Sequence, residues 1–303
     1  MEIINKSNLK YSSQLEGGSG GERVAPNSLR GIDAHQHFWK YDAIKHSWID
    51  DEMAGIRKDF LPQHLLPILL NNGIAGCVAV QADQTEAETN FLLSLASENE
   101  FIKGVVGWVD LRADNIQQRL EYYSQFKPLK GFRHILQGED PSFMLQASFL
   151  NGIAQLTKHK YTYDILIYPK HLESVLHLVQ QFPDQPFIVD HLAKPYIKAG
   201  LIDDWEKGMM ALAKQPNVYC KVSGMVTEAD YKQWKSTDFT PYVDVVVAAF
   251  GMDRLLFGSD WPVCEVAASY QQMMGIVYNY FSNFSQLEQE KFYRLNALKF
   301  YNL

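Results

Sequence analysis

The sequence has few of the features that mark secreted or disulfide-rich proteins. It contains only three cysteines, Cys77, Cys220 and Cys264, which are far apart and form no CxxC motif. An odd number of separated cysteines argues against a disulfide framework or a structural zinc knot, and it favours buried thiols in a reducing compartment. We therefore expect a cytoplasmic protein.

Long apolar runs and a basic stripe are also missing. No apolar stretch of roughly 18 residues occurs, and the N-terminus has no apolar core of a secretory signal, so we expect no membrane partner. The 28 Lys and Arg residues are outnumbered by 35 Asp and Glu residues, which gives a formal net charge of −7. This balance argues against a nucleic-acid partner. We expect a small-molecule substrate, and a homodimer as the assembly to test.

What is present is a regular alternation of element types. Residues 1–28 are polar and rich in Gly and Ser at 17–21, so we interpret them as a flexible tail or linker. Over residues 29–303, short apolar runs predict strands at Gly31–His35, Ala75–Gln81, Ile102–Asp110, Leu129–Ile135, Tyr163–Tyr168, Phe187–His191, Val218–Ser223 and Leu255–Asp260. Amphipathic segments between them predict helices at Asp59–Asn71, Thr85–Asn99, Asp114–Ser124, Phe149–His159, Lys170–Gln181, Ile202–Ala213, Thr240–Phe250 and Val266–Phe281. This alternation predicts an α/β fold, a single-domain (β/α)8 TIM barrel.

Polar and ionisable side chains cluster where the predicted strands end. His35 and His37 are two residues apart, so on an extended chain both rings point to one face. His191 and Asp260 end two later runs. Because strand ends converge on one face of a barrel, these residues would share a pocket, which indicates an enzyme.

Three imidazoles and one carboxylate form a plausible site for a divalent cation. His35, His37, His191 and Asp260 could hold one Zn²⁺ or similar ion, which would polarise a carbonyl and activate a water. Asp260 could accept the proton of that water with or without a metal. The alternative is that each histidine merely bonds to backbone at the end of its strand.

Arg133 and His134 end the fourth predicted strand. The Arg133 guanidinium suits a carboxylate or a polarised carbonyl oxygen. The alternative is a salt bridge to Asp110 or Asp164. His134 should point away from Arg133 on a strand, yet both are retained as candidates, Arg133 for catalysis and His134 for substrate binding.

Further candidates for substrate binding lie near other strand ends. Gln81 and Tyr168 could bind hydroxyl groups. Trp39 and Trp261 could stack on the apolar face of a sugar or a flat ring. The alternative for the two tryptophans is packing within loops.

Four motifs carry a family resemblance: IDAHQHFW (32–39), GFRHIL (131–136), VDHLAKP (189–195) and LLFGSDWP (255–262). Together they resemble the amidohydrolase superfamily, in particular its amidohydrolase-2 branch of L-fuconolactonase-like and L-rhamnonolactonase-like sugar lactonases. The resemblance implies that His35 and His37 match the first-strand pair, His191 the sixth-strand histidine and Asp260 the aspartate that handles the water proton.

The sequence departs from better-known superfamily members. The fourth predicted strand has Arg133-His134 where they have a carboxylated lysine or a glutamate, and the fifth lacks a histidine. The resemblance therefore implies a mononuclear site, with zinc the first candidate, or no metal.

We expect a hydrolase that opens a sugar 1,4- or 1,5-lactone to an aldonic acid. In this hypothesis Asp260 is the base toward water, and His191 and Arg133 assist catalysis. Two alternatives are a metal-dependent decarboxylase of an aromatic or unsaturated acid, and a non-catalytic binding barrel.

Overall fold

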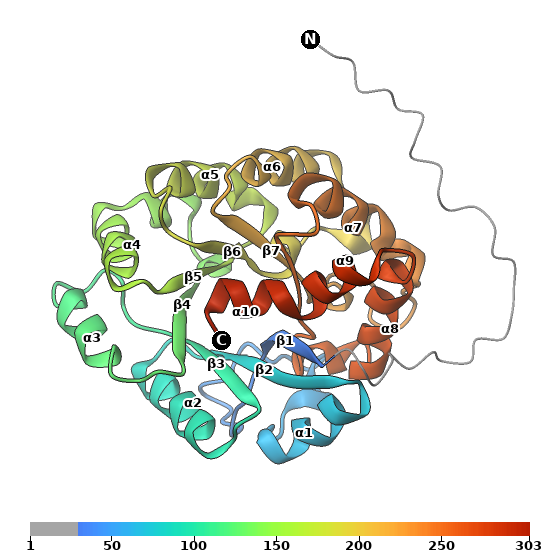
Figure 1. Ribbon diagram of the computed structural model, residues 1–303, viewed down its shortest axis with the longest axis horizontal. Coiled ribbons are helices and arrows are strands. Elements are labelled where there is room, and N and C mark those ends of the chain that lie inside the picture. The colour runs from blue at the N-terminus through green and yellow to red at the C-terminus, as the bar shows by residue number, and fades with distance from the viewer. Residues whose placement is uncertain (1–29) are drawn as a thin grey trace, which may run out of the picture.

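The computed structural model describes residues 30–303 and contains one parallel sheet whose eight strands follow in sequence order. The strands are β1 (Gly31–Gln36), β2 (Ile74–Val80), β3 (Ile102–Gly107), β4 (Leu129–Ile135), β5 (Thr162–Leu166), β6 (Phe187–Val189), β7 (Val218–Val222) and β8 (Leu255–Phe257). Helices alternate with them around the sheet (Figure 1). The predicted (β/α)8 barrel is confirmed, whereas the predicted tail, residues 1–28, lies outside the described residues.

The first and last strands meet just beyond their carboxyl ends. Gln36 forms a parallel bridge with Trp261. The Asp260 amide donates to the His35 carbonyl at 2.8 Å, and the His37 amide donates to the Trp261 carbonyl at 2.7 Å. These bonds bring together two segments more than two hundred residues apart in sequence, at the level of the predicted site.

Most of the helices pack around the strands and bury one side. They are α1 (Pro62–Asn71), α2 (Glu86–Glu98), α3 (Ile116–Tyr123), α4 (Ala147–His159), α5 (Leu172–Gln181), α6 (Asp203–Ala213), α7 (Ser236–Phe250), α8 (Tyr270–Phe281), α9 (Gln286–Glu290) and α10 (Asn296–Tyr301). In α5, for example, Val175, Leu178 and Val179 are fully buried, as expected for an amphipathic helix on a sheet. None of the helices in residues 30–303 combines the length and the apolar character that a membrane span needs.

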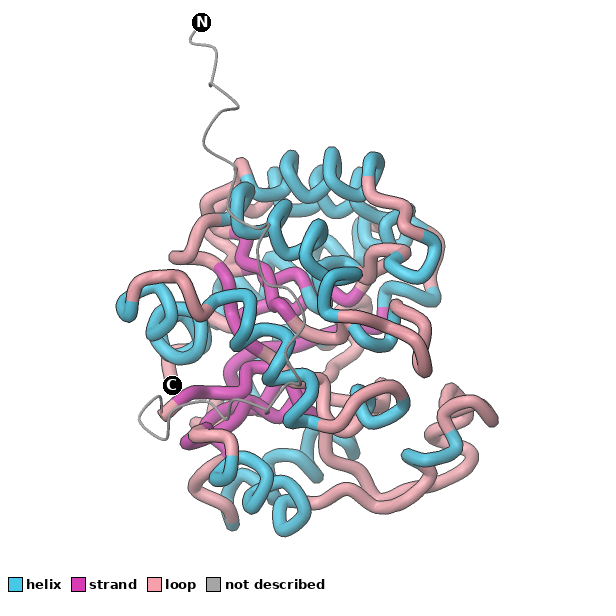
Figure 2. Tube along the Cα trace, turned by 90° about the vertical axis from the view of Figure 1, so that its right-hand side faces the viewer, coloured by secondary structure: helices cyan, strands magenta, loops and turns pink. Residues whose placement is uncertain are grey.

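A second apolar cluster fills the inside of the barrel. Ile32, Val78, Val106, Ile188 and Leu256 come from five strands and pack together with residues of α10. Figure 1 shows α10 lying across the centre of the ring of strands. In the side view of Figure 2 the C-terminus lies on one side of the molecule, and long loops project on the opposite side. Helix α10 thus covers one end of the barrel, and the predicted site lies at the opposite end.

The predicted elements all exist, but several ends differ. The predicted sixth and eighth strands include His191 and Asp260, whereas β6 ends at Val189 and β8 ends at Phe257. Both functional candidates have positive φ, 52° for His191 and 59° for Asp260, which an extended ladder does not allow. These residues therefore lie in turns that follow the strands.

Candidate active site

The two histidines of the first strand end lie close together. His35 is the fifth residue of β1, and His37 follows the strand. Their ring centroids are 5.0 Å apart. The Nδ1 atom of His37 is 2.8 Å from the Val80 carbonyl, which can only accept, so this nitrogen carries the ring proton. The Nε2 atom of His37 is therefore left to face the pocket.

His191 is placed by a turn after β6. Its Nδ1 atom is 2.8 Å from the Ser223 hydroxyl, which follows β7. The next residue, Gly224, has φ of +58°, and a Cβ there would lie 2.5 Å from His191 Nδ1. Only glycine lets the imidazole approach β7 this closely. Burial lowers the pKa of His191 well below its usual value, so the ring is neutral.

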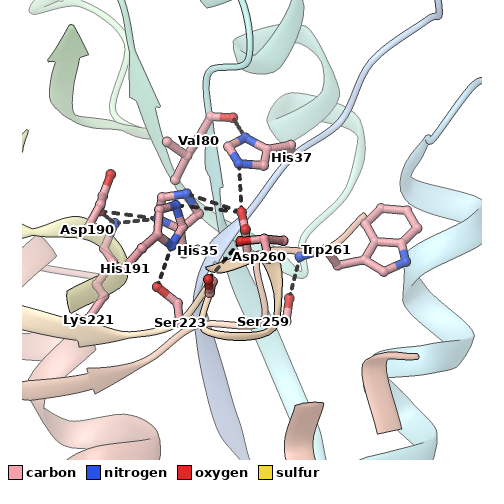
Figure 3. Close-up of polar contacts among 12 residues, drawn as sticks. His35, His37, Val80, Asp190, His191, Lys221, Ser223, Ser259, Asp260 and Trp261 are labelled. Carbon is pink, nitrogen blue, oxygen red and sulfur yellow. Dashed lines mark hydrogen bonds and ion pairs between the residues drawn. The ribbon is translucent and has the colours of Figure 1, made fainter. Parts of the chain in front are cut away.

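The Asp260 carboxylate faces the three imidazoles (Figure 3). Its Oδ1 atom is 3.3 Å from His37 Nε2, 3.7 Å from His191 Nε2 and 3.9 Å from His35 Nε2. Burial by itself would raise the pKa of Asp260, but His191 and His37 outweigh burial and keep that pKa below its ordinary value. The carboxylate is therefore ionised near neutral pH.

A buried carboxylate on β1 holds the turn that carries Asp260. Asp33 Oδ1 accepts from the Ser259 amide at 2.9 Å, and Asp33 Oδ2 accepts from the Ser259 hydroxyl at 2.6 Å and the Tyr270 hydroxyl at 3.1 Å. The Ser259 hydroxyl also accepts from the Trp261 amide at 2.9 Å. The two residues that flank Asp260 are thus held in place, Ser259 by Asp33 and Trp261 by the Ser259 hydroxyl. We call this arrangement of Asp33, Ser259 and Tyr270 the Asp33 clamp.

Arg133 lies inside the barrel beside His35. Its Nη1 atom is 3.2 Å from His35 Nε2 and 3.1 Å from Asp190 Oδ2. Its Nη2 atom donates to the side-chain oxygen of Gln81 at 3.1 Å and to the Gln81 carbonyl. The alternative salt bridge to Asp110 or Asp164 is wrong, because Asp190 is the partner.

Both ring nitrogens of His35 have buried polar neighbours. A guanidinium can only donate, so His35 Nε2 is the acceptor in its contact with Arg133. The other nitrogen, Nδ1, lies 3.2 Å from Asp190 Oδ1. Burial lowers the pKa of His35 well below its usual value, which keeps this ring neutral.

A lysine that the sequence analysis missed lies beneath the histidines. Lys221 Nζ, on β7, is 3.0 Å from Asp190 Oδ1 and 3.1 Å from His35 Nδ1, and it also contacts Asp164. Its side chain is 0% exposed, so it is fully buried among these partners. Burial would raise the pKa of Asp190, but Lys221 and His35 hold it well below its usual value. A lysine within the apolar run Val218–Val222 was the signal available in the sequence.

The donor set suits a divalent cation. Ligand atoms of His35, His191 and Asp260 lie within 4.8 Å of one another. In a tetrahedral zinc site with bonds of about 2.0–2.1 Å, ligand atoms are roughly 3.4 Å apart, which is comparable to the separations around Asp260 Oδ1. The Nδ1 atoms of both histidines have outer partners, as metal-bound imidazoles usually do. Because His35 Nε2 has one lone pair, a cation there would displace only its contact with Arg133.

Some of the other predicted residues lie at the candidate site, and others are packed elsewhere. Gln81 lies at the site and orients Arg133, and the Tyr168 ring lies 5.8 Å from Lys194 Nζ. Trp39 is buried within the loop after β1 and donates to the Lys58 carbonyl at 2.9 Å. His134 points away from Arg133 and stacks on Phe143 with ring centroids 5.0 Å apart.

Trp261 is also directed away from the histidines. Figure 3 shows its ring turned away from Asp260, and its Nε1 atom donates to Glu265 at 2.8 Å. Its ring packs against Phe38 and Phe60. The structure thus brings together His35, His37, Gln81, Arg133, His191 and Asp260, and it places His134 and Trp261 among core aromatic residues.

Comparisons with known proteins agree with this geometry. The family model described as amidohydrolase matches residues 32–303. An L-fucono-1,5-lactonase of Burkholderia multivorans is 38% identical over 257 residues, covering 81% of this chain and 86% of the relative. An L-fucono-1,5-lactonase of Burkholderia ambifaria is 35% identical over 240 residues, covering 79% and 82%.

Solved structures show the same relationship. A crystal structure of an amidohydrolase from Burkholderia multivorans with bound zinc has a TM-score of 0.87 and 36% identity, covering 90% of this chain and 99% of that one. Two manganese-bound decarboxylases are 13% and 15% identical and share the fold alone.

Proposed function

This chain belongs to the amidohydrolase family, and from that premise we propose that it is a sugar lactonase, which opens a 1,4- or 1,5-lactone to an aldonic acid. The observation that carries the proposal is the Asp260 carboxylate enclosed by three imidazoles. An ionised base next to hydrogen-bonding imidazole rings and a fixed cation is a set suited to ester hydrolysis. The two relatives with lactonase names support the substrate class.

The residues can perform the reaction as follows. Asp260 accepts a proton from water as the water oxygen attacks the lactone carbonyl carbon. His191 can present Nε2–H to the developing oxyanion, because the Ser223 hydroxyl can donate to Nδ1. Arg133 contributes a permanent positive charge, and its contacts with Asp190 and Gln81 keep it in place. When the ring C–O bond breaks, Asp260 returns its proton to the departing ring oxygen.

A divalent cation is the second part of the proposal. His35, His191 and Asp260 would hold it, with His37 as a predicted further ligand, and we propose zinc. When bound, such an ion supplies a Lewis acid that polarises the carbonyl. The zinc-bound Burkholderia multivorans structure supports this choice.

Acid release from a panel of sugar 1,4- and 1,5-lactones tests the function. A pH-indicator assay would use the protein as purified, after chelation, and after adding Zn²⁺ or Mn²⁺, with metal content measured in each sample. We expect acid release from at least one lactone. A rate that survives chelation assigns catalysis to the side chains alone, whereas a rate lost on chelation and restored by zinc assigns part of it to the metal.

The same panel can refute the proposal. No acid release under all three conditions would contradict it. If the protein then held one metal per chain, the decarboxylase hypothesis would take its place, and aromatic acids would be the next substrates to test.

A further inference from the structure

An ion pair that the proposed mechanism does not use lies near the candidate active site. Lys194 Nζ is 2.5 Å from Glu228 Oε1, and the two side chains are only 15% and 14% exposed. Burial would lower the pKa of Lys194, but Glu228 outweighs burial and raises it, so the lysine is charged. A largely buried ion pair is costly to desolvate, and it contributes little to stability on average. Its position therefore calls for another explanation.

The backbone that carries Lys194 is strained. His191, Leu192, Ala193 and Lys194 all have positive φ, between 50° and 58°, and none is glycine. Trp205 Nε1 holds this turn by donating to the Leu192 carbonyl at 2.6 Å. Strain of this kind is costly and concentrates at functional sites. The same turn places His191 at one end and Lys194 at the other.

Lys194 lies near Tyr168, a candidate for substrate binding. Its Nζ atom is 5.8 Å from the centre of the Tyr168 ring. An ammonium has three donors, and among residues 30–303 Glu228 is the one acceptor in hydrogen-bond contact with Nζ. Two donors of Lys194 therefore remain for a ligand.

Glu228 also lines an open polar cleft. The cleft has a volume of about 590 Å³, and its walls include Thr227, Tyr231, Asp51 and Glu52. Acidic and hydroxyl side chains such as these are suited to sugar hydroxyl groups, which both donate and accept hydrogen bonds. Glu228 therefore belongs both to the ion pair with Lys194 and to the wall of this cleft.

We propose that Lys194 and Glu228 are the specificity-determining pair that binds ring hydroxyl groups of the lactone, with the cleft receiving the part of the sugar remote from the carbonyl. The inference rests on the proposed lactonase function. Lys194 donates to one hydroxyl oxygen and Glu228 accepts from a hydroxyl hydrogen. A substrate lacking that hydroxyl leaves a donor of Lys194 or an acceptor site of Glu228 unmatched in a largely buried place, which is why such sites discriminate strongly.

A cycle of enzyme variants against deoxy substrates tests the pair. The variants are Lys194→Met, Glu228→Gln and the double variant, with Lys207→Met as a control on the surface of α6, where the lysine is 76% exposed. The substrates are the best lactone of the panel and analogues that each lack one hydroxyl. For at least one hydroxyl, wild type should prefer the parent by about 100-fold in kcat/KM, and Lys194→Met should reduce that preference below about 10-fold. Lys207→Met should match wild type.

The outcomes separate this inference from the lactonase proposal. Equal loss of kcat/KM on every substrate, or an unchanged preference in all variants, would overturn the hydroxyl-binding role while leaving lactonase activity established. If wild type opens no lactone, both proposals fall. Should Lys194→Met fail to fold, Lys194→Arg carries the test, since it keeps the charge and moves the donors. A shifted hydroxyl preference supports the inference, and an unshifted one contradicts it.

Discussion

At the scale of single residues, the position of Asp260 depends on the buried carboxylate of Asp33. Asp33 is 0% exposed and accepts from Ser259 and Tyr270, so it fixes the residue that precedes Asp260. It also accepts from the His35 amide at 3.2 Å. One side chain thus joins β1, which carries a candidate ligand, to the turn that carries the candidate base.

We predict that Asp33→Asn lowers kcat and leaves KM nearly unchanged. The amide nitrogen cannot accept a hydrogen bond, so one contact of the Asp33 clamp is lost and Asp260 shifts relative to the substrate. Misplacement of a catalytic group by about 1 Å can cost about 100-fold in rate. Steady-state kinetics on the best lactone would measure the effect, with circular dichroism to show that the variant is folded.

Tyr270→Phe is the milder control, because both Ser259 donors to Asp33 remain. Its kcat should lie between those of wild type and Asp33→Asn. A folded Asp33→Asn variant with wild-type kcat would show that Asp260 needs no such support.

The sequence predicted residues whose spacing is local or whose motif is distinctive. His35 and His37 followed from strand periodicity, and Asp260 from the polar end of an apolar run. Lys221 and Lys194 were missed because their partners, Asp164, Asp190 and Glu228, come from other elements. Alternation also could not place Trp261, which lies beyond β8 in a turn where the two-residue period no longer applies.

At the scale of elements, α2 supports the loop that carries Gln81. Thr85 caps the helix by accepting from the Glu88 amide at 3.2 Å. Glu88 Oε1 accepts in turn from the Ala82 amide at 3.3 Å. Burial raises the pKa of Glu88 to about 7, and Asp83 adds to the increase.

This raised pKa predicts a pH dependence of stability. The folded state holds a proton on Glu88 up to about pH 7, whereas an unfolded glutamate releases it near 4.5. Stability therefore falls as the pH rises through this window. The free energy of unfolding of wild type, relative to Glu88→Gln, should fall by on the order of 1–2 kcal/mol between pH 5 and pH 8. Urea unfolding at both pH values would measure it.

Glu98→Gln provides the matched control, since Glu98 is exposed near the other end of α2. It should leave the pH dependence as in wild type. Identical pH profiles for wild type and Glu88→Gln would contradict the assignment.

The elements themselves were predictable, whereas their ends were not. Apolar runs and amphipathic periods located all eight strands and the helices between them. The predicted β6 and β8 ran too far because a sequence pattern does not register positive φ at His191 and Asp260. In those two turns the chain leaves the regular strand conformation and directs the side chains of His191 and Asp260 toward the candidate site.

At the scale of the whole molecule, the candidate site is held by contacts from two parts of the barrel. Closure between β1 and the turn after β8 brings His35 and Asp260 together. From the other end, Tyr301 of α10 donates to Asp164 at 2.7 Å, and Asp164 pairs with Lys221 beneath the histidines. The C-terminal helix is therefore connected to the site through buried polar contacts.

Properties that depend on partners did not follow from the fold. A homodimer, a cytoplasmic location and the absence of nucleic-acid and membrane partners stay predictions. The family and the lactonase names of the relatives bear on the substrate and not on assembly.

The measurement that tests the account most directly is acid release by Asp260→Asn beside wild type, on the best lactone of the panel. Asn keeps the size of the side chain and cannot accept a proton from water. Loss of a general base should lower kcat by roughly 10²–10⁴-fold while the thermal unfolding temperature stays close to that of wild type. A folded Asp260→Asn protein that releases acid at the wild-type rate would contradict the central claim, because the carboxylate at the closure of the barrel would then not be the base.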